Sequence, residues 1–166
     1  MRLNRRLLIL AAGVGAVGLR VGLAAISGTA RAAETFPVSH TDEEWRMLLT
    51  GDQYSILRKE GTEYPFTSPL LNEHRKGVFN CAGCGQDVFS SQTKFESGTG
   101  WPSFWAPLNA GVVGTTRDIS LGMIRTEVHC SRCRGHLGHL FDDGPKPTGL
   151  RYCMNGAAMA FRLSVS

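Results

Sequence analysis

The sequence has no stripe of basic residues and no block of like charge outside its first segment. Its 166 residues carry a formal net charge of +4, from 18 lysines and arginines against 14 acids. Five of the arginines fall within residues 1–32, which contain no acid, so the rest of the chain has 13 basic and 14 acidic residues and a net charge of −1. Nucleic-acid-binding domains present a basic patch. We therefore expect no binding to DNA or RNA.

The sequence also lacks an unbroken apolar stretch long enough for a permanent membrane anchor. Apolar residues fill positions 7–17 and 21–26, but Arg20 separates them, and a spanning helix needs roughly 20 predominantly apolar residues. Arg5 and Arg6 before a mildly apolar stretch, with small residues at positions 30 and 32, are typical of a twin-arginine export signal. We expect residues 1–32 to be this signal and residues 33–166 to be the mature domain. The mature protein is then expected in the bacterial periplasm. A general secretory signal and an uncleaved anchor are the alternatives.

There is no low-complexity segment and no internal repeat beyond two short cysteine motifs, so we expect one modest domain. Thr41 and Glu44 form a capping-box pattern, which predicts a helix that starts just after Thr41. Trp45, Leu48 and Leu49 have the spacing of one apolar helix face. Gly51 is a plausible end of this helix.

A second short helix is predicted over about residues 52–58, with Tyr54 and Leu57 facing inward and Gly61 at its end. The remaining sequence consists of short apolar segments separated by glycines, the pattern of strands and turns. It predicts a mainly β domain with short N-terminal helices. The predicted strands are residues 78–79, 88–89, 112–116, 123–129, 137–141 and 157–163.

The chain has only five cysteines, and four of them form two matched C-x-x-C pairs: Cys81 with Cys84, and Cys130 with Cys133. Two such pairs suit one tetrahedral zinc ion, because each pair offers both sulfurs to the same metal. Disulfides are an alternative in an exported protein, and a redox C-x-x-C is another. The matched spacing, without a thioredoxin-type proline or tryptophan beside the cysteines, favours one structural zinc ion.

The fifth cysteine, Cys153, has no partner in this arrangement. A thiol reacts as the thiolate, and a nearby cation or imidazolium lowers its pKa. His136 and His139 lie upstream in an H-x-x-H segment that contains no carboxylate and no third histidine, so we expect no metal site there. On a strand they would lie on opposite faces, whereas a turn at Gly138 would let both point one way. Each histidine could be purely structural, but two of them near an unpaired cysteine favour acid–base chemistry.

An aromatic cluster, WPSFW at residues 101–105, follows two glycines at positions 98 and 100. Such clusters usually pack in a hydrophobic core, and they also form rigid pocket walls. We expect Phe104 in the core and Trp101 at a pocket.

Together, GWPSF at residues 100–104, GHLGHLF at 135–141, RYCMN at 151–155 and the two C-x-x-C pairs resemble the methionine-R-sulfoxide reductases of the MsrB type. The similarity runs from about residue 42 to residue 161. It implies a fold of two antiparallel sheets, sometimes called a β-tent, with the zinc ion distant from the active site.

The resemblance also implies the roles of individual residues. Cys153 is the expected nucleophile, and His136 and His139 are expected to position substrate or water and to protonate the sulfoxide oxygen. Trp101 is expected to hold the substrate methyl group. Arg151 and Asn155 are expected to tune the thiolate and its hydrogen bonds, with Arg151 also contributing to substrate binding.

By this resemblance the chain is an oxidoreductase that reduces methionine-R-sulfoxide in oxidised proteins or peptides and leaves a sulfenic acid on Cys153. Many relatives have a resolving cysteine just before the GWPSF segment, where this chain has Thr99. We therefore expect an external reductant, a thioredoxin-like protein or a small thiol, and a monomeric enzyme. A zinc-stabilised binding module without catalysis and a generic thiol oxidoreductase are the alternatives.

Overall fold

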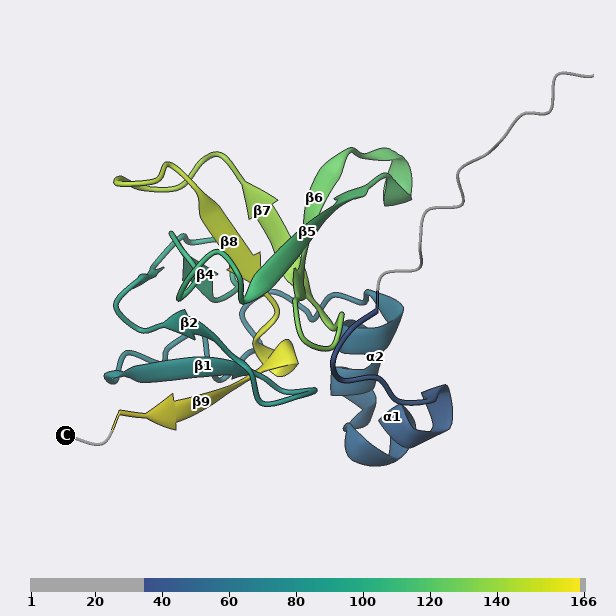
Figure 1. The fold of residues 1–166 in the computed structure, drawn as a ribbon. Helices are drawn as coiled ribbons and strands as arrows, with labels where there is room; N and C mark the ends of the chain where they lie inside the picture. Colours follow the sequence, from purple (N-terminus) through teal and green to yellow (C-terminus); the bar gives the residue numbers. More distant parts are fainter. Residues whose placement is uncertain (1–34, 165–166) are drawn as a thin grey trace, which may run out of the picture. The chain divides into compact units, whose positions relative to one another are not determined.

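The computed structural model describes residues 35–164, which form two short helices followed by β-structure (Figure 1). The predicted export signal lies outside the described residues. None of the helices within residues 35–164 is long and apolar enough to cross a bilayer. The helices are α1 (Asp42–Leu48) and α2 (Gly51–Lys59), and the 3₁₀ turns are Ser120–Gly122 and Gly156–Ala158. The strands are β1 (Gly77–Cys81), β2 (Asp87–Ser90), β3 (Lys94–Phe95), β4 (Ser103–Phe104), β5 (Val113–Asp118), β6 (Arg125–Cys130), β7 (His136–Phe141), β8 (Arg151–Met154) and β9 (Met159–Leu163).

The strands of the described residues form two antiparallel sheets, which confirms the predicted fold class. The smaller sheet has the order β2-β1-β9 and the larger one β3-β4-β8-β7-β6-β5. In Figure 1 the smaller sheet lies along the lower left and the hairpin of β5 and β6 extends from the larger one. The last two strands, β8 and β9, carry the chain from one sheet to the other.

Both helices begin with a capping box. Thr41 and Glu44 cap α1 as predicted, and Thr50 with Gln53 forms a second box at the start of α2. Gly51 therefore begins α2 instead of ending α1. Trp45 is buried, but the predicted inward position of Leu48 is wrong, because this side chain is 60% exposed.

Part of the core lies between the two sheets, where aromatic rings from both sheets pack together. Phe104 of the larger sheet stacks on Phe89 of the smaller one with ring centroids 4.5 Å apart. The Phe79 ring contacts the Phe104 ring edge-on, with centroids 4.9 Å apart. All three side chains are completely buried. The prediction that Phe104 belongs to the core is confirmed.

A β-bulge in β7 orients the two histidines. His136 pairs with His129 and Gly138 pairs with Val128, so Leu137 is an extra residue without a partner on β6. One extra residue reverses the alternation of side chains along a strand. His136 and His139, three positions apart, consequently point to the same side, with ring centroids 5.2 Å apart. The two histidines therefore lie in a strand and not in a turn at Gly138. They still point to the same side, because the bulge provides the shared orientation that was expected only of a turn.

Candidate active site and metal site

The four paired cysteines meet at one point, although the two pairs are far apart in the sequence. Cys81 ends β1 and Cys130 ends β6, and each is followed by a turn that brings in the second cysteine of its pair. The four Sγ atoms all lie within 4.8 Å of one another. The sulfurs of Cys81 and Cys133 are 3.7 Å apart and those of Cys84 and Cys130 are 3.5 Å apart. All four are free thiols, as a metal site requires and a pair of disulfides would not allow.

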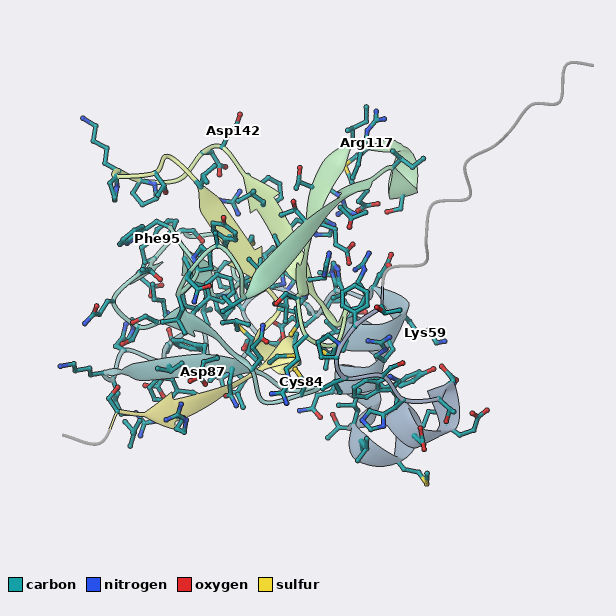
Figure 2. All side chains as sticks on the ribbon, viewed as in Figure 1. Lys59, Cys84, Asp87, Phe95, Arg117 and Asp142 are labelled. Carbon is teal, nitrogen blue, oxygen red and sulfur yellow. The ribbon has the colours of Figure 1, made fainter. Side chains whose placement is uncertain are left out.

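These sulfur positions fit a tetrahedral metal ion. Thiolates about 2.3 Å from a central ion stand roughly 3.8 Å from one another, close to the two measured separations. Hydrogen bonds from the Gly85 amide to the Cys81 carbonyl, 2.8 Å, and from the Arg134 amide to the Cys130 carbonyl, 2.9 Å, close the two turns. Cys84, labelled in Figure 2, is only partly buried, while the other three are buried. The four residues therefore form a potential metal-binding site.

A pocket of about 130 Å³ on the larger sheet brings together four of the predicted site residues, and the paired C-x-x-C cysteines are not among its lining residues. Its walls include Trp101, His139, Cys153 and Asn155. His139 and Cys153 are direct partners in the pairing of β7 with β8. The remaining lining residues are Thr62, Arg125, Gly138 and Phe141.

The Cys153 thiol is partly buried and faces a hydroxyl group. Its Sγ lies 3.7 Å from the Thr99 hydroxyl, which is linked in turn to Ser97. Burial raises the pKa of the Cys153 thiol, and the Thr99 hydrogen bond and the Arg151 charge oppose this only in part. Arg151, which the family resemblance implied would tune the thiolate, lowers the pKa of Cys153 through its positive charge. Burial outweighs it, so the thiol of the free enzyme is predominantly protonated at neutral pH.

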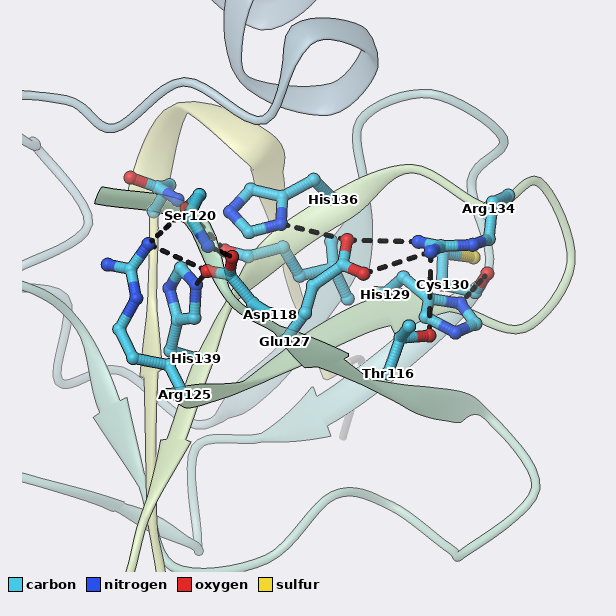
Figure 3. Close-up of polar contacts among 12 residues, drawn as sticks. Thr116, Asp118, Ser120, Arg125, Glu127, His129, Cys130, Arg134, His136 and His139 are labelled. Atoms are coloured by element: carbon cyan, nitrogen blue, oxygen red, sulfur yellow. Dashed lines mark hydrogen bonds and ion pairs between the residues drawn. The ribbon is translucent and has the colours of Figure 1, made fainter. Parts of the chain in front are cut away.

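His139 contacts a carboxylate that sequence patterns did not reveal. Its Nε2 lies 2.8 Å from Oδ2 of Asp118, at the end of β5 (Figure 3). Arg125 donates to the same oxygen at 2.7 Å, and the Ser120 amide donates to Oδ1 at 2.8 Å. Burial lowers the pKa of His139 and outweighs the opposing effect of Asp118. The imidazole is therefore predominantly neutral at neutral pH.

His136 lies behind His139 and is not one of the pocket-lining residues. It is 2% exposed, and its Nδ1 lies 3.0 Å from Oε1 of Glu127 on β6 (Figure 3). Arg134 donates to both oxygens of Glu127 at 2.9 Å. Burial opposes ionisation of Glu127, but hydrogen bonds from His136 and Arg134 prevail and lower its pKa to about 2. The H-x-x-H segment contains no carboxylate of its own, but the fold brings Glu127 and Asp118 to the two histidines.

Asn155 and Trp101 are held by the same backbone segment at residue 63. The Asn155 side chain donates to the Leu137 carbonyl at 3.2 Å and accepts from the Glu63 amide at 3.1 Å. The Trp101 indole donates to the Glu63 carbonyl at 3.1 Å. The Glu63 carboxylate in turn accepts from the amides of Gly156 and Ala157. Glu63 thus fixes one wall of the pocket, a role that no local motif indicated.

Arg151 is close to Cys153 in sequence but is not among the residues that line the pocket. Its guanidinium group makes two hydrogen bonds to Asp143, at 2.8 and 2.9 Å, and lies 4.3 Å above the Phe141 ring. In this position it acts on Cys153 through its charge, while Phe141 contributes the pocket surface.

Comparison with known proteins defines the class to which this fold and site belong. The SelR domain family matches residues 49–163. The chain is 54% identical to the peptide methionine sulfoxide reductase MsrB of Leptospira interrogans over 127 residues, 76% of this chain and 97% of the relative. It is 53% identical to the protein of the same name from Agrobacterium fabrum over 124 residues, 75% of this chain and 92% of the relative. A third, from Methanosarcina barkeri, is 53% identical over 125 residues, 75% of this chain and 88% of the relative.

The chain therefore belongs to the SelR family, with the MsrB peptide methionine sulfoxide reductases as its relatives. This confirms the family that the sequence motifs indicated. It also confirms the prediction that the chain is an oxidoreductase.

Proposed function

We propose that this enzyme reduces the R epimer of methionine sulfoxide in oxidised proteins or peptides, with Cys153 as the nucleophile. The observation that carries the proposal is the pocket that Cys153 shares with Trp101, His139 and Asn155. A soft thiolate is suited to attack at sulfur. A neutral imidazole beside it can take the thiol proton and then, as the imidazolium, pass it to the sulfoxide oxygen. A four-cysteine metal site alone would stabilise a binding module but would not require this pocket.

The first step transfers the sulfoxide oxygen to the enzyme. Cys153 enters as a thiolate and attacks the sulfoxide sulfur while the oxygen is protonated, which forms an S–S bond between enzyme and substrate. The hydroxyl group then passes from the substrate sulfur to the Cys153 sulfur as the S–O and S–S bonds of this adduct break. The products are methionine and Cys153 sulfenic acid, so the substrate sulfur is reduced by two electrons and the cysteine sulfur is oxidised by two. The Trp101 ring would receive the substrate methyl group and thereby select one epimer.

The second step depends on an external thiol. The four other cysteines are gathered at the metal site, and Thr99 faces Cys153 across 3.7 Å. A first external thiol would form a mixed disulfide with Cys153 and release water, and a second would restore the Cys153 thiol. A thioredoxin-like protein or a small thiol supplies both reducing equivalents, and a monomer suffices for this cycle.

We also propose that the metal is zinc and that its role is structural. Zn²⁺ prefers four thiolates in closed structural sites, and such a site leaves no coordination position for a substrate. When bound, zinc would hold the ends of β1 and β6 together. Export by the twin-arginine route to the periplasm completes the proposal, because that route would allow metal loading before export. Replacing Arg5 and Arg6 by lysine in the full chain tests it: the protein should remain in the cytoplasm, and unchanged export would contradict this route.

The proposed activity is tested on the separated R and S diastereomers of a methionine sulfoxide peptide, with dithiothreitol as the reductant. The wild-type enzyme should reduce only the R form, and Cys153→Ser should abolish the activity while leaving the metal content and the unfolding temperature unchanged. Activity on the S form alone, or activity that survives in Cys153→Ser, would overturn the proposal.

A further inference from the structure

The two histidines of β7 are bound by two different carboxylates through two different nitrogen atoms. Asp118 of β5 contacts Nε2 of His139 at 2.8 Å, and Glu127 of β6 contacts Nδ1 of His136 at 3.0 Å (Figure 3). The bulge at Leu137 makes this division possible. Glu127 pairs in register with His139, yet its carboxylate is used by His136, and the neighbouring strand supplies a separate acid for His139.

Both carboxylates are held in their ionised form. Hydrogen bonds from the backbone and side chain of Ser120, and from His139, hold the pKa of Asp118 well below its usual range. Glu127 receives the two guanidinium hydrogen bonds of Arg134. An ionised carboxylate only accepts hydrogen bonds. The imidazole nitrogen that faces each acid must therefore carry the proton.

A neutral imidazole has one N–H and one bare nitrogen. The contacts above leave Nδ1 bare in His139 and Nε2 bare in His136. The second of these atoms is completely buried and has no hydrogen-bond partner among the described residues. A buried acceptor without a partner is costly, which is consistent with a functional role.

We propose that Asp118 and Glu127 are positioning residues that fix opposite tautomers of the two histidines, Nε2–H in His139 and Nδ1–H in His136. Each ring is thereby aligned with one bare nitrogen, and in His139 that atom can take up a proton and release it again. His139, which lines the pocket, is the ring that serves the sulfoxide oxygen. His136, with its centroid 5.2 Å away, fixes the position of His139 from behind. The catalytic role given to His139 rests on the proposed function, whereas the assignment of the two tautomers does not depend on it.

Four groups from the surrounding strands lie close to His139. Asp118 of β5 stabilises the imidazolium form, and Arg125 of β6 and His136 of β7 disfavour it. Cys153 of β8 is its cross-strand partner. Removing the Asp118 charge would leave Arg125 unopposed. His139 would then protonate at lower pH, so the imidazolium that serves the sulfoxide oxygen should be lost at lower pH than in the wild type.

The tautomers are observable directly by long-range ¹H–¹⁵N NMR on the full chain labelled with ¹⁵N-histidine, at a pH where the imidazoles are neutral. His136→Gln and His139→Gln identify the two signals among the five histidines of the chain. The expected result is Nδ1–H for His136 and Nε2–H for His139. The opposite tautomer at either ring would overturn the proposal, whether or not the protein shows the proposed activity.

Kinetics on Glu127→Gln and Asp118→Asn provide the functional readout. We expect kcat to fall roughly 10- to 100-fold with little change in KM, since orientation of an acid–base group is lost while the pocket remains. Glu127→Asp should recover part of the loss. Asp87→Asn, which removes a partly exposed acid paired with Arg162 at 2.8 Å, is the matched control and should retain full activity. Unchanged kcat and unchanged tautomers in folded, metal-replete Glu127→Gln would contradict the positioning role.

Discussion

The hydroxyl oxygen of Thr99 lies 3.7 Å from the sulfur of Cys153. The family resemblance of the sequence implies a resolving cysteine at this position in many relatives, and the Thr99 hydroxyl faces the proposed nucleophile. The distance is short enough that a second sulfur at this position would need only a small movement to reach bonding distance, about 2.05 Å. Position 99 is thus close enough to Cys153 for an internal disulfide, but its side chain carries a hydroxyl instead of a thiol.

Thr99→Cys should consequently let the enzyme resolve its sulfenic acid through an internal disulfide, in place of direct attack by an external thiol. After one turnover without reductant, we expect an intramolecular disulfide between residues 99 and 153, seen by mass spectrometry as a loss of two hydrogens. Thr99→Ser keeps a hydroxyl and serves as the matched control, which should leave a sulfenic acid on Cys153. If Thr99→Cys turned over without forming this disulfide, the two positions would not be close enough in solution.

Gly138 permits the close approach of β7 to β8 at the nucleophile. A Cβ atom on Gly138 would collide with the backbone carbonyl of Cys153 and would also crowd Met154. Gly138→Ala should therefore displace Cys153 or destabilise the domain by about 1–3 kcal/mol, as overpacking does. Chemical denaturation and kcat/KM measure the two effects. Gly85→Ala, in a turn with open space around it, tests strain from its positive φ of 72° without touching Cys153 and should spare activity.

The burial of Cys153 predicts the pH dependence of its reactivity. Because the pKa of the free-enzyme thiol is raised, the thiolate fraction is small at neutral pH and grows as the pH rises through and above the ordinary range for cysteine. Alkylation of Cys153 by a neutral reagent such as iodoacetamide, followed by mass spectrometry, should accelerate over that range. Arg151→Met should shift the profile to still higher pH, because the Arg151 charge lowers this pKa. A plateau already reached below pH 7 would contradict the burial argument.

Metal removal should affect stability before it affects the pocket. The four sulfurs join the turns after β1 and β6, and structural zinc sites supply on the order of 10 kcal/mol of apparent binding free energy in small domains. We expect a strong chelator, or Cys130→Ser, to lower the unfolding temperature sharply in thermal denaturation. Cys153→Ser should bind one equivalent of zinc and unfold like the wild type. Equal stability with and without metal would show that the site is not structural.

Local sequence signals were sufficient for those features that depend on residue spacing. The matched pairs of cysteines indicated a common site, the capping box placed the start of α1, and the alternation of short apolar segments indicated six of the strands. The three strands that were not predicted, β3, β4 and β8, are two to four residues long. They exist because long-range pairing stabilises them, and no periodicity can emerge over so few residues.

The carboxylates behind the histidines were missed for a related reason. Asp118 is 21 residues from His139, and Glu127 is nine from His136, so only the pairing of β5, β6 and β7 brings them together. The bulge at Leu137 decides which acid meets which histidine. An acid flanked by Thr126 and Val128 within a predicted strand was the available signal for Glu127, since a charged residue among strand formers usually has a specific partner.

The most direct test of the central claim is a single turnover with the R diastereomer of a methionine sulfoxide peptide, using stoichiometric enzyme and no reductant. Trapping with dimedone and peptide mass spectrometry should place one adduct on Cys153, one equivalent of methionine should form, and the four metal-site cysteines should remain unmodified. An intramolecular disulfide involving Cys153, or methionine formed without oxidation of Cys153, would contradict the single-cysteine mechanism.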